Sequence, residues 1–448
     1  MDIQLLSAVL IGIAFLLFLI LRLKIQAFLA LLIVCIAVGM MAGMPATEIL
    51  ETIKDGMGST LGFVATVVGL GALFGGILEQ SGGAQRLASS MLRKTGEKRA
   101  PWAMMATGFL VAIPVFFDVA FIILVPVTYA LSKRTGKSLL LYAIPLLAGL
   151  AITHAFIPPT PGPIAVADIL GADLGWVILF GFFAGLPAAV ISGPFFARFI
   201  SKKIHVNPDV FEDKEDYEKT LAPSPGLVIS IIFVPILLIV VNTLITSPLF
   251  SNFNISPTVL YVIELIGHPF TALIIANLIA WYFLGVRRGM QKDYLLKIGN
   301  KSFKAAGIII LLTGAGGAFK QILINTGAGE MIAEGLNNSA FNPLVFGFIV
   351  AALVRILQGS STVAMITAAG ITAPILTEGL YSVQQISLIV IAVASGATIL
   401  SHVNDSGFWL VGQYLGLSEK QTFRSWTVMT SLIAIVGLVM SLLMWMII

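Results

Sequence analysis

The chain has 448 residues, of which 58% are hydrophobic and only 11% are charged. A soluble domain typically carries about 25% charged residues, so this composition excludes an ordinary soluble enzyme. One membrane-spanning helix needs about 20 apolar residues, and the apolar content suffices for roughly a dozen such helices. The net charge of +4 does not indicate nucleic-acid binding, because the basic residues lie in short loops between apolar runs.

The residue counts also exclude several kinds of site. A single cysteine, Cys35, allows no internal disulfide and no cysteine-based metal site. The four histidines are too scattered for a HExxH zinc helix, and no GxxxxGK[ST] phosphate loop occurs. We therefore expect no cofactor, no metal and no ATPase activity in this chain.

The predicted elements are apolar helices that follow one another with little polar sequence between them. Strands would alternate in polarity, and these runs do not. In chain order the uncharged runs are Leu5–Leu21, Ile25–Thr47, Met57–Leu78, Pro101–Phe117, Val119–Ser132, Ser138–Thr153, Leu174–Ala197, Gly226–Thr246, Pro269–Val286, Ala305–Phe319, Gly335–Val354, Ile356–Thr377, Gly379–Ser401 and Ser425–Ile448. The one hydrophilic stretch, about Ser201–Ser224, is predicted to be a solvated cytoplasmic linker between two membrane units, 1–200 and 226–448.

The two halves resemble each other in sequence. Gly69–Ala88 and Gly314–Ala333 match at seven of twenty positions, at an offset of 245 residues. At nearly the same offset, Asp118-Val-Ala-Phe-Ile aligns with Thr362-Val-Ala-Met-Ile, and Thr153-His154 aligns with Ser401-His402. Several matches in the same order indicate an internal duplication.

The charges of the loops indicate that the two repeats have opposite orientations. Basic loops stay in the cytoplasm. The first half has basic loops at Arg22/Lys24, Arg93–Arg99 and Lys133–Lys137, whereas the loops expected at their counterparts, Ser247–Leu260, Ala333–Asn342 and Glu378–Gln384, lack Lys and Arg. Conversely, the acidic loop expected at Glu48–Asp55 corresponds to the basic loop expected at Arg287–Lys304. The predicted fold is an all-α polytopic membrane protein with two inverted-topology repeats, re-entrant hairpins and broken helices, and with both termini outside. Such repeats are typical of secondary transporters, which bind substrate near the bilayer midplane.

Four segments interrupt the helical pattern at matching places: 113–118 and 154–163 in the first half, and 355–362 and 401–407 in the second. Hydrocarbon cannot satisfy the backbone groups that Pro and Gly leave free, so such breaks persist only where they face protein or a wet cavity. In one interpretation these residues merely kink packed helices. In the other, Gly359, Ser360, Ser361 and Thr362 present hydrogen-bond donors to an anionic substrate, and Pro159, Thr160 and Gly162 lie in a matching break.

Ionisable residues inside apolar runs usually mark function, because each costs several kcal/mol in lipid. Asp118 lies between two uncharged runs and would occupy the apex of a hairpin, where a carboxyl group removed from water can carry a proton. The alternative is a helix cap or a periplasmic turn. Arg355 has the forked geometry that binds a carboxylate through two hydrogen bonds. Its alternative is a structural pair with Asp118 or Asp405.

The last broken segment and its counterpart carry further candidates. His402 and Asn404 have donors and acceptors suited to substrate hydroxyls, and Asp405 is a second candidate proton carrier. His154, at the position aligned with His402, is a third, although a lone histidine is often only a packed hydrogen-bonding residue.

At these residues the sequence resembles the gluconate:proton symporters, a family of bacterial sugar-acid permeases. The resemblance covers essentially the whole chain, and its most specific stretches are Ser401–Trp409, Gly314–Lys320, Gly359–Ala364 and Pro158–Pro163. It implies proton-driven uptake of gluconate or a related acid across the bacterial inner membrane. Many members of that family carry His where Thr160 stands and Glu where Asp118 stands, so a proton role for that histidine is not transferred to this chain.

The leading hypothesis is therefore a proton-coupled importer of a hydroxylated monocarboxylate, embedded in the lipid bilayer and with no nucleic-acid partner. The runner-up is a sodium-coupled carboxylate carrier of similar two-repeat architecture. An intramembrane enzyme would need a nucleophile and a base, which Ser360 or Ser361 and His402 could supply, but no GxSxG elbow is present. A channel would instead show flux without saturation or pH dependence. The sequence leaves open which acid is carried and whether the chain forms a homo-oligomer.

Overall fold

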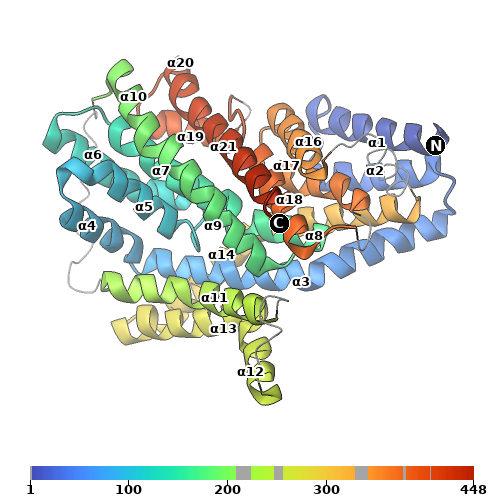
Figure 1. The fold of residues 1–448 in the computed structure, drawn as a ribbon, viewed down its shortest axis with the longest axis horizontal. Coiled ribbons are helices and arrows are strands. Elements are labelled where there is room, and N and C mark those ends of the chain that lie inside the picture. The colour runs from blue at the N-terminus through green and yellow to red at the C-terminus, as the bar shows by residue number, and fades with distance from the viewer. Residues whose placement is uncertain (1–2, 208–222, 247–255, 328–341, 377–379, 404) are drawn as a thin grey trace.

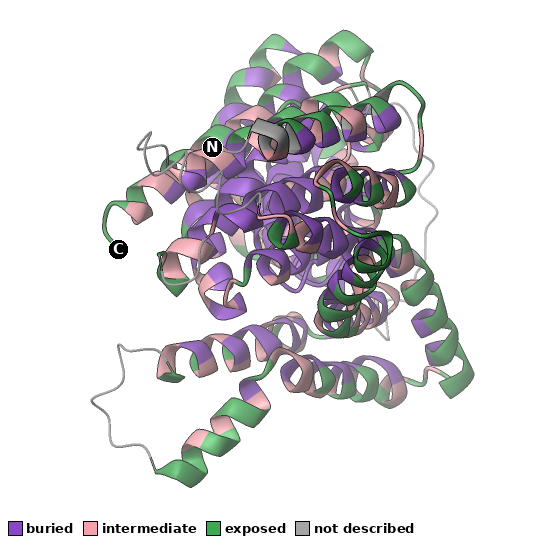
Figure 2. Ribbon diagram, turned by 90° about the vertical axis from the view of Figure 1, so that its right-hand side faces the viewer, coloured by how far each residue is buried: buried purple, intermediate pink, exposed green. Residues whose placement is uncertain are grey.

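The computed structural model describes residues 3–207, 223–246, 256–327, 342–376, 380–403 and 405–448, and within these ranges every regular element is a helix (Figure 1). Seven of the described helical segments are long and apolar enough to cross a membrane, and shorter apolar helices lie between them. Buried residues concentrate in the centre of the bundle, and exposed ones cover its periphery (Figure 2). The prediction of an all-α polytopic membrane protein is confirmed.

The first half runs from α1 to α10. Its elements are α1 (Ile3–Leu21), α2 (Ala27–Met41), α3 (Ala46–Gln80), α4 (Gly83–Thr95), η1 (Glu97–Arg99), α5 (Ala100–Val111), α6 (Phe117–Thr135), α7 (Leu140–Phe156), α8 (Pro161–Leu170), α9 (Leu174–Val190), η2 (Ile191–Phe195) and α10 (Phe196–Lys203).

The second half runs from α11 to α21. Its elements are α11 (Pro225–Thr246), α12 (Pro257–Gly267), α13 (Pro269–Ala280), η4 (Trp281–Gly285), η5 (Val286–Arg288), α14 (Lys292–Asn325), α16 (Pro343–Gln358), α17 (Ser361–Thr372), η6 (Ala373–Ile375), α18 (Val383–Gly396), α19 (Ser406–Tyr414), α20 (Glu419–Thr422), η7 (Phe423–Thr427) and α21 (Val428–Trp445). Most of the predicted linker, residues 208–222, lies outside the described residues, and the boundaries of the two membrane units stay a prediction.

The helices repeat with the same period as the sequence. Matched helices begin at Ala46 and Lys292, at Phe117 and Ser361, at Pro161 and Ser406, and at Leu174 and Glu419, which are offsets of 246, 244, 245 and 245 residues. The duplication seen in short sequence matches therefore extends to the order and spacing of the helices.

The two longest helices, α3 and α14, are equivalent in the two halves and pack against each other antiparallel (Figure 1). Near the start of α3, Thr52 Oγ1 accepts a hydrogen bond from Asn325 Nδ2 at 3.0 Å, at the end of α14. At the other end, Tyr294 donates its hydroxyl to Gln80 Oε1 at 2.7 Å. Equivalent helices that run in opposite directions are what inverted topology requires.

The predictions of loops at Glu48–Asp55 and at Arg287–Lys304 were wrong in the same way. Glu48–Asp55 lies inside α3, and all but the first few residues of Arg287–Lys304 lie inside α14. A helix of 35 residues is about 52 Å long, whereas the hydrocarbon core of a bilayer is about 30 Å thick. The charged residues therefore continue these helices beyond the apolar core instead of ending them.

Each of two hairpins contains a helix too short to cross the bilayer alone. Helix α5, with 12 residues, is about 18 Å long and turns at 112–116 into α6. In the second half α16 turns at Gly359 and Ser360 into α17, and Gly359 has the positive φ of 91° that glycine adopts without strain. The breaks between α7 and α8 and between α18 and α19 also lie where the sequence predicts them.

Helix α3 holds both first-half breaks in place through two glycines. A Cβ added at Gly75 would lie 1.9 Å from the carbonyl oxygen of Pro114, in the hairpin turn. One at Gly71, a helical turn earlier, would lie 3.0 Å from the carbonyl oxygen of Pro159. Only a residue without a side chain lets α3 approach these turns so closely.

We expect Gly75→Ala to lower the thermal stability of the purified protein, because the added methyl group must displace the hairpin backbone. Such overpacking typically costs about 1–3 kcal/mol. Gly62→Ala is the matched control in the same helix, because no atom lies within 4 Å of its added Cβ. Thermal unfolding of both variants in detergent checks this, and equal melting temperatures would contradict the close approach.

Basic segments of both halves lie at one end of the bundle. Arg134 forms an ion pair of 2.9 Å with Glu97, and a surface hollow is lined by Lys98, Lys137 and Lys202. The start of α14 joins the same end through Gln80, which directly precedes the turn into α4. This arrangement agrees with the cytoplasmic placement that the basic residues predict.

We expect Val383→Cys to react with an impermeant maleimide on whole cells and Lys292→Cys to react only after permeabilisation. Both positions are exposed at helix starts, and the sole native cysteine, Cys35, is buried and gives no background. Labelling of both variants from the same side would contradict the inverted topology.

Candidate functional site

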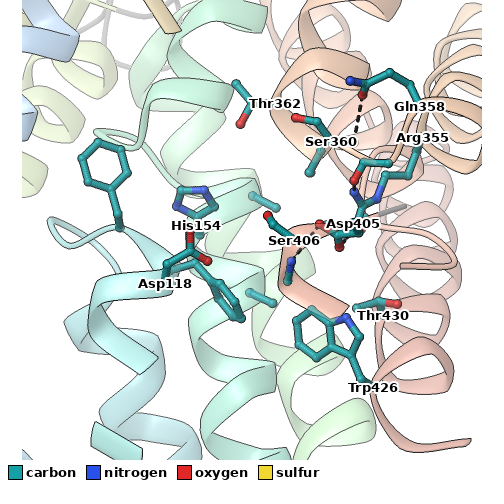
Figure 3. Close-up of a pocket in the computed structure, with 18 of the residues that line it drawn as sticks. Asp118, His154, Arg355, Gln358, Ser360, Thr362, Asp405, Ser406, Trp426 and Thr430 are labelled. Carbon is teal, nitrogen blue, oxygen red and sulfur yellow. Dashed lines mark hydrogen bonds and ion pairs between the residues drawn. The ribbon is translucent and has the colours of Figure 1, made fainter. Parts of the chain in front are cut away.

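A cavity of about 600 Å³ lies between the two halves, where the broken helices meet (Figure 3). This volume falls within the range of small-molecule sites. Asp118 and His154 line it from the first half, opposite Arg355, Ser360 and Asp405 from the second. Its other lining residues are Phe116, Phe117, Val119, Ala151, Ala155, Ile309, Gln358, Gly359, Ser361, Thr362, Thr398, Ser406, Gly407, Trp426 and Thr430.

The first half supplies one carboxylate and one imidazole. Asp118 lies in the first turn of α6, directly after the hairpin turn, and is exposed to the cavity. His154 lies in the last turn of α7, with its ring 6.3 Å from that of Phe116. The Nδ1 atom of His154 is buried and has no hydrogen-bond partner among the described residues.

The second half supplies an ion pair. Arg355 donates from one terminal nitrogen to the carbonyl oxygen of Gly359 and from the other to Asp405 Oδ2, at 2.5 Å. The side chain of Arg355 is 5% exposed and that of Asp405 is 12% exposed, so little water screens the pair. The structure thus shows the pairing with Asp405 that the sequence analysis gave as the alternative role of Arg355. The Nε atom of Arg355 is buried without a partner among the described residues.

Further hydrogen bonds fix the orientation of Asp405. Ser401 donates its hydroxyl to Asp405 Oδ2, and Trp426 donates its indole N–H to Ser401 Oγ at 2.6 Å. The other carboxylate oxygen, Oδ1, accepts from the backbone N–H of Gly407 at 3.0 Å and caps α19. Asp405 therefore links a helix start, the arginine and the last helical segment of the chain.

Three helices begin at the cavity wall: α6 at Phe117, α17 at Ser361 and α19 at Ser406. The first N–H groups of a helix have no intrahelical acceptor, and its dipole places partial positive charge there. At α17, Ser360 is the N-cap residue and accepts from the N–H of Val363, while Gln358 Oε1 accepts from the N–H of Ser360 at 2.8 Å. Ser361 Oγ is buried without a partner among the described residues. These helix starts suit an anion with hydroxyl groups.

Four of the predicted substrate-binding residues do not line this cavity. Pro159 and Thr160 lie at a much smaller hollow of about 10 Å³ beside Gly71, and an added Cβ on Gly162 would meet Met365. The Nε2 atom of His402 is hydrogen-bonded to the carbonyl oxygen of Ile356 at 2.8 Å. Asn404, a fifth predicted residue, lies outside the described residues.

The cavity also contains polar residues that the sequence analysis did not single out: Gln358, Thr398, Ser406, Trp426 and Thr430. Gln358 and Ser406 lie inside the predicted breaks 355–362 and 401–407, so their position was a usable signal. Trp426 and Thr430 lie inside the uncharged run Ser425–Ile448, where nothing local distinguishes them. Among the described residues no three His, Cys, Asp or Glu side chains lie close enough to hold a metal ion.

The fold resembles solved membrane transporters. The YdaH transporter of Alcanivorax borkumensis superposes with a TM-score of 0.67 at 12% identity, covering 94% of this chain and 98% of that one. MtrF of Neisseria gonorrhoeae superposes with a TM-score of 0.65 at 16% identity, covering 88% and 84%. At these identities the likeness establishes the fold alone.

Relatives with much closer sequences establish the family. The chain is 39% identical to the low-affinity gluconate transporter of Escherichia coli K12, over 96% of this chain and 95% of that one. It is 38% identical to a gluconate permease of Pseudomonas aeruginosa, over 99% and 98%, and 37% identical to the L-idonate transporter of the Gnt-II system of E. coli K12, over 95% and 96%. The family model of the GntP permeases matches residues 4–447. The chain is thus a multi-pass transporter of the bacterial inner membrane, not an enzyme, and it belongs to the GntP family of permeases.

Proposed function

We propose that this permease imports gluconate or a closely related sugar acid together with protons, and that the substrate binds in the cavity between the two halves. The observation that carries the proposal is the lining of that cavity. It combines one arginine, two aspartates, three helix starts and a ring of hydroxyl and amide side chains. The names of the relatives, gluconate and L-idonate transporters, support the same class of substrate.

The polar groups of the cavity match a polyhydroxylated chain. Ser361 Oγ and His154 Nδ1 belong to residues that line the cavity and have no hydrogen-bond partner among the described residues, and Thr362, Gln358 and Ser406 add further donors and acceptors. Each buried unpaired polar atom costs about 1–3 kcal/mol. Substrate hydroxyl groups would remove that cost, which a hydrocarbon-chain acid could not do.

The charges of the cavity explain why an anion needs a co-transported cation. Arg355, Asp118 and Asp405 are its lining residues with formal charge, so with both carboxylates ionised the net charge is −1. A monoanionic substrate is repelled by that charge. One proton brings the cavity to neutrality, and a second makes it positive and attractive.

The ion pair supplies a way to couple the two ligands. Asp405 accepts a hydrogen bond from a terminal nitrogen of Arg355, and a substrate carboxylate would compete for the same nitrogen. When Asp405 is protonated its hold on the guanidinium weakens, and the arginine becomes available for the carboxylate. The proton and the substrate then bind together, and Asp118, which faces the same space, is the group through which that proton enters and leaves the cavity.

The test of the substrate is radiolabelled gluconate uptake into proteoliposomes, with unlabelled competitors. We expect gluconate and L-idonate to compete, because both present a carboxylate and a polyol chain. Glucose lacks the carboxylate and acetate lacks the hydroxyl groups, so neither should compete at equal concentration. Equal competition by glucose would contradict a role for Arg355, and equal competition by acetate would contradict hydroxyl recognition.

A further inference from the structure

A polar hollow of about 480 Å³ lies at the basic end of the bundle, which the loop charges predict to face the cytoplasm. Its volume falls within the range of small-molecule sites. Three segments meet around it: η1 with the start of α5, the turn between α6 and α7, and α10 with the residues that follow it. It shares no lining residue with the cavity between the two halves.

Hydrogen bonds join two of these segments and form one wall of the hollow. Ser138, in the turn after α6, donates its hydroxyl to the carbonyl oxygen of Ile204 at 3.0 Å and accepts from the N–H of Val206 at 3.2 Å. The N–H of Leu139 donates to the carbonyl oxygen of Val206 at 3.0 Å. All four residues are buried. The wall is therefore part of the packed structure and does not depend on the positions of exposed side chains.

The hollow has an excess of positive charge. The basic residues that line it are Lys98, Lys137, Arg198 and Lys202. All of them are exposed, and none forms an ion pair with another described residue. The acidic lining residue, Glu97, is paired at 2.9 Å with Arg134, which lies outside the lining. The described residues around the hollow thus leave its basic side chains free to bind an anion.

Topology alone explains that basic residues lie at this end, because short cytoplasmic loops are rich in Lys and Arg. It does not require that residues from three segments line the same hollow. Arg93 and Lys133 are exposed at the same end and do not line it. Like charges around one hollow repel one another. A bound anion would remove that repulsion.

The charge and the size of the hollow fit a phosphate monoester. This group carries about −1.5 to −2 charges at pH 7 and has three strong acceptor oxygens. The guanidinium group of Arg198 can donate two parallel hydrogen bonds to it, and each lysine adds a compact positive charge. Helix α7 begins beside the hollow, so the partial positive charge of its first turn has the same sign. A monocarboxylate has a single charge and would balance less of the excess.

We propose that this hollow binds a phosphate monoester at the cytoplasmic face of the permease. Arg198 and Lys202 bind the phosphate from α10, and Lys98 and Lys137 bind it from the other two segments. Lys98 precedes α5 and Lys137 follows α6, so the ligand contacts both outer ends of the hairpin whose turn precedes Asp118. A soluble phosphorylated metabolite and the headgroup of phosphatidic acid both present this chemistry.

Isothermal titration of the purified full-length protein with glycerol 3-phosphate, in phosphate-free buffer, tests the proposal. We expect saturable binding of glycerol 3-phosphate and no binding of glycerol. Lys137→Gln and Arg198→Gln should each weaken binding about fivefold, because an exposed charge pair contributes up to about 1 kcal/mol. Lys133→Gln and Arg93→Gln are the matched controls. Each removes one exposed basic charge at the same end from a residue that does not line the hollow, and each should keep the affinity.

Short-chain phosphatidic acid distinguishes the two sources, because it carries the same glycerol phosphate with two acyl chains. Equal affinity for the two probes would support a soluble ligand. Tighter binding of phosphatidic acid that is weakened by Lys137→Gln would support the same phosphate site with a lipid as its ligand. Absence of binding by both probes would overturn the proposal. Equal weakening in the control variants and in the lining variants would also overturn it, because diffuse positive charge would then account for the binding.

Discussion

Replacing Asp118 with asparagine is expected to abolish accumulation of gluconate against its gradient while exchange of gluconate across the membrane persists. Asp118 faces the cavity from the start of α6. Asparagine keeps its size and much of its hydrogen bonding but cannot take up a proton. Without that proton, entry of an anion into a negatively charged cytoplasm is opposed by about 2.3 kcal/mol per charge per 100 mV. The measurements are uphill uptake and counterflow in proteoliposomes.

The matched control is Asp118→Glu, which keeps an ionisable carboxyl group at the same helix start. It should retain measurable accumulation, with any loss due to the longer side chain. An Asp118→Asn protein that still concentrates gluconate would contradict the role of this residue. Loss of both accumulation and exchange would instead show that the change disrupts binding or folding.

Replacing Arg355 with lysine is expected to weaken gluconate binding about 10- to 150-fold, although the charge is kept. Arg355 uses two terminal nitrogens at once, one on Gly359 and one on Asp405. A lysine ammonium group cannot reproduce that fork, and the loss of a charge-assisted hydrogen bond costs roughly 1.5–3 kcal/mol. Isothermal titration of purified protein with gluconate measures the effect.

The variant Asp405→Asn distinguishes two roles of Asp405. In one, its carboxylate competes with the substrate for Arg355; in the other, it only supports the fold. Asparagine can still accept from the N–H of Gly407 and cap α19, but it no longer holds the guanidinium by charge. We therefore expect gluconate to bind Asp405→Asn with less dependence on pH than it binds the unmodified protein, and more tightly at alkaline pH. Equal weakening of binding at every pH would show that Asp405 only supports the fold.

Much of the architecture follows from local chemistry. The breaks at Pro114, Pro158–Pro163, Gly359 and Ser401–Gly407 are visible because Pro and Gly interrupt apolar runs, and the structure places every one of them at a helix end. Asp118, Arg355 and Asp405 stand out because ionisable residues are rare in such runs. The offset of about 245 residues relates the two sets of breaks before any coordinates are known.

The remainder depends on contacts between segments distant in the sequence. Trp426 reaches the cavity because Ser401 accepts its indole N–H, a contact across 25 residues that no local pattern indicates. Pro159 and Thr160 resemble site residues by symmetry, but Gly71 of α3 approaches so closely that their backbone packs against the helix. The charged ends of α3 and α14 resemble loops because composition alone does not show that a helix continues beyond the bilayer.

The most direct test of proton-coupled sugar-acid transport is the internal pH of proteoliposomes after gluconate is added outside. The liposomes contain a pH-sensitive dye, no sodium, and valinomycin with equal potassium on both sides to hold the membrane potential at zero. Our account predicts that gluconate acidifies the interior at a saturable rate, that glucose does not, and that the Asp118→Asn protein gives no acidification. Gluconate entry with no change of internal pH, or entry that requires sodium, would contradict it.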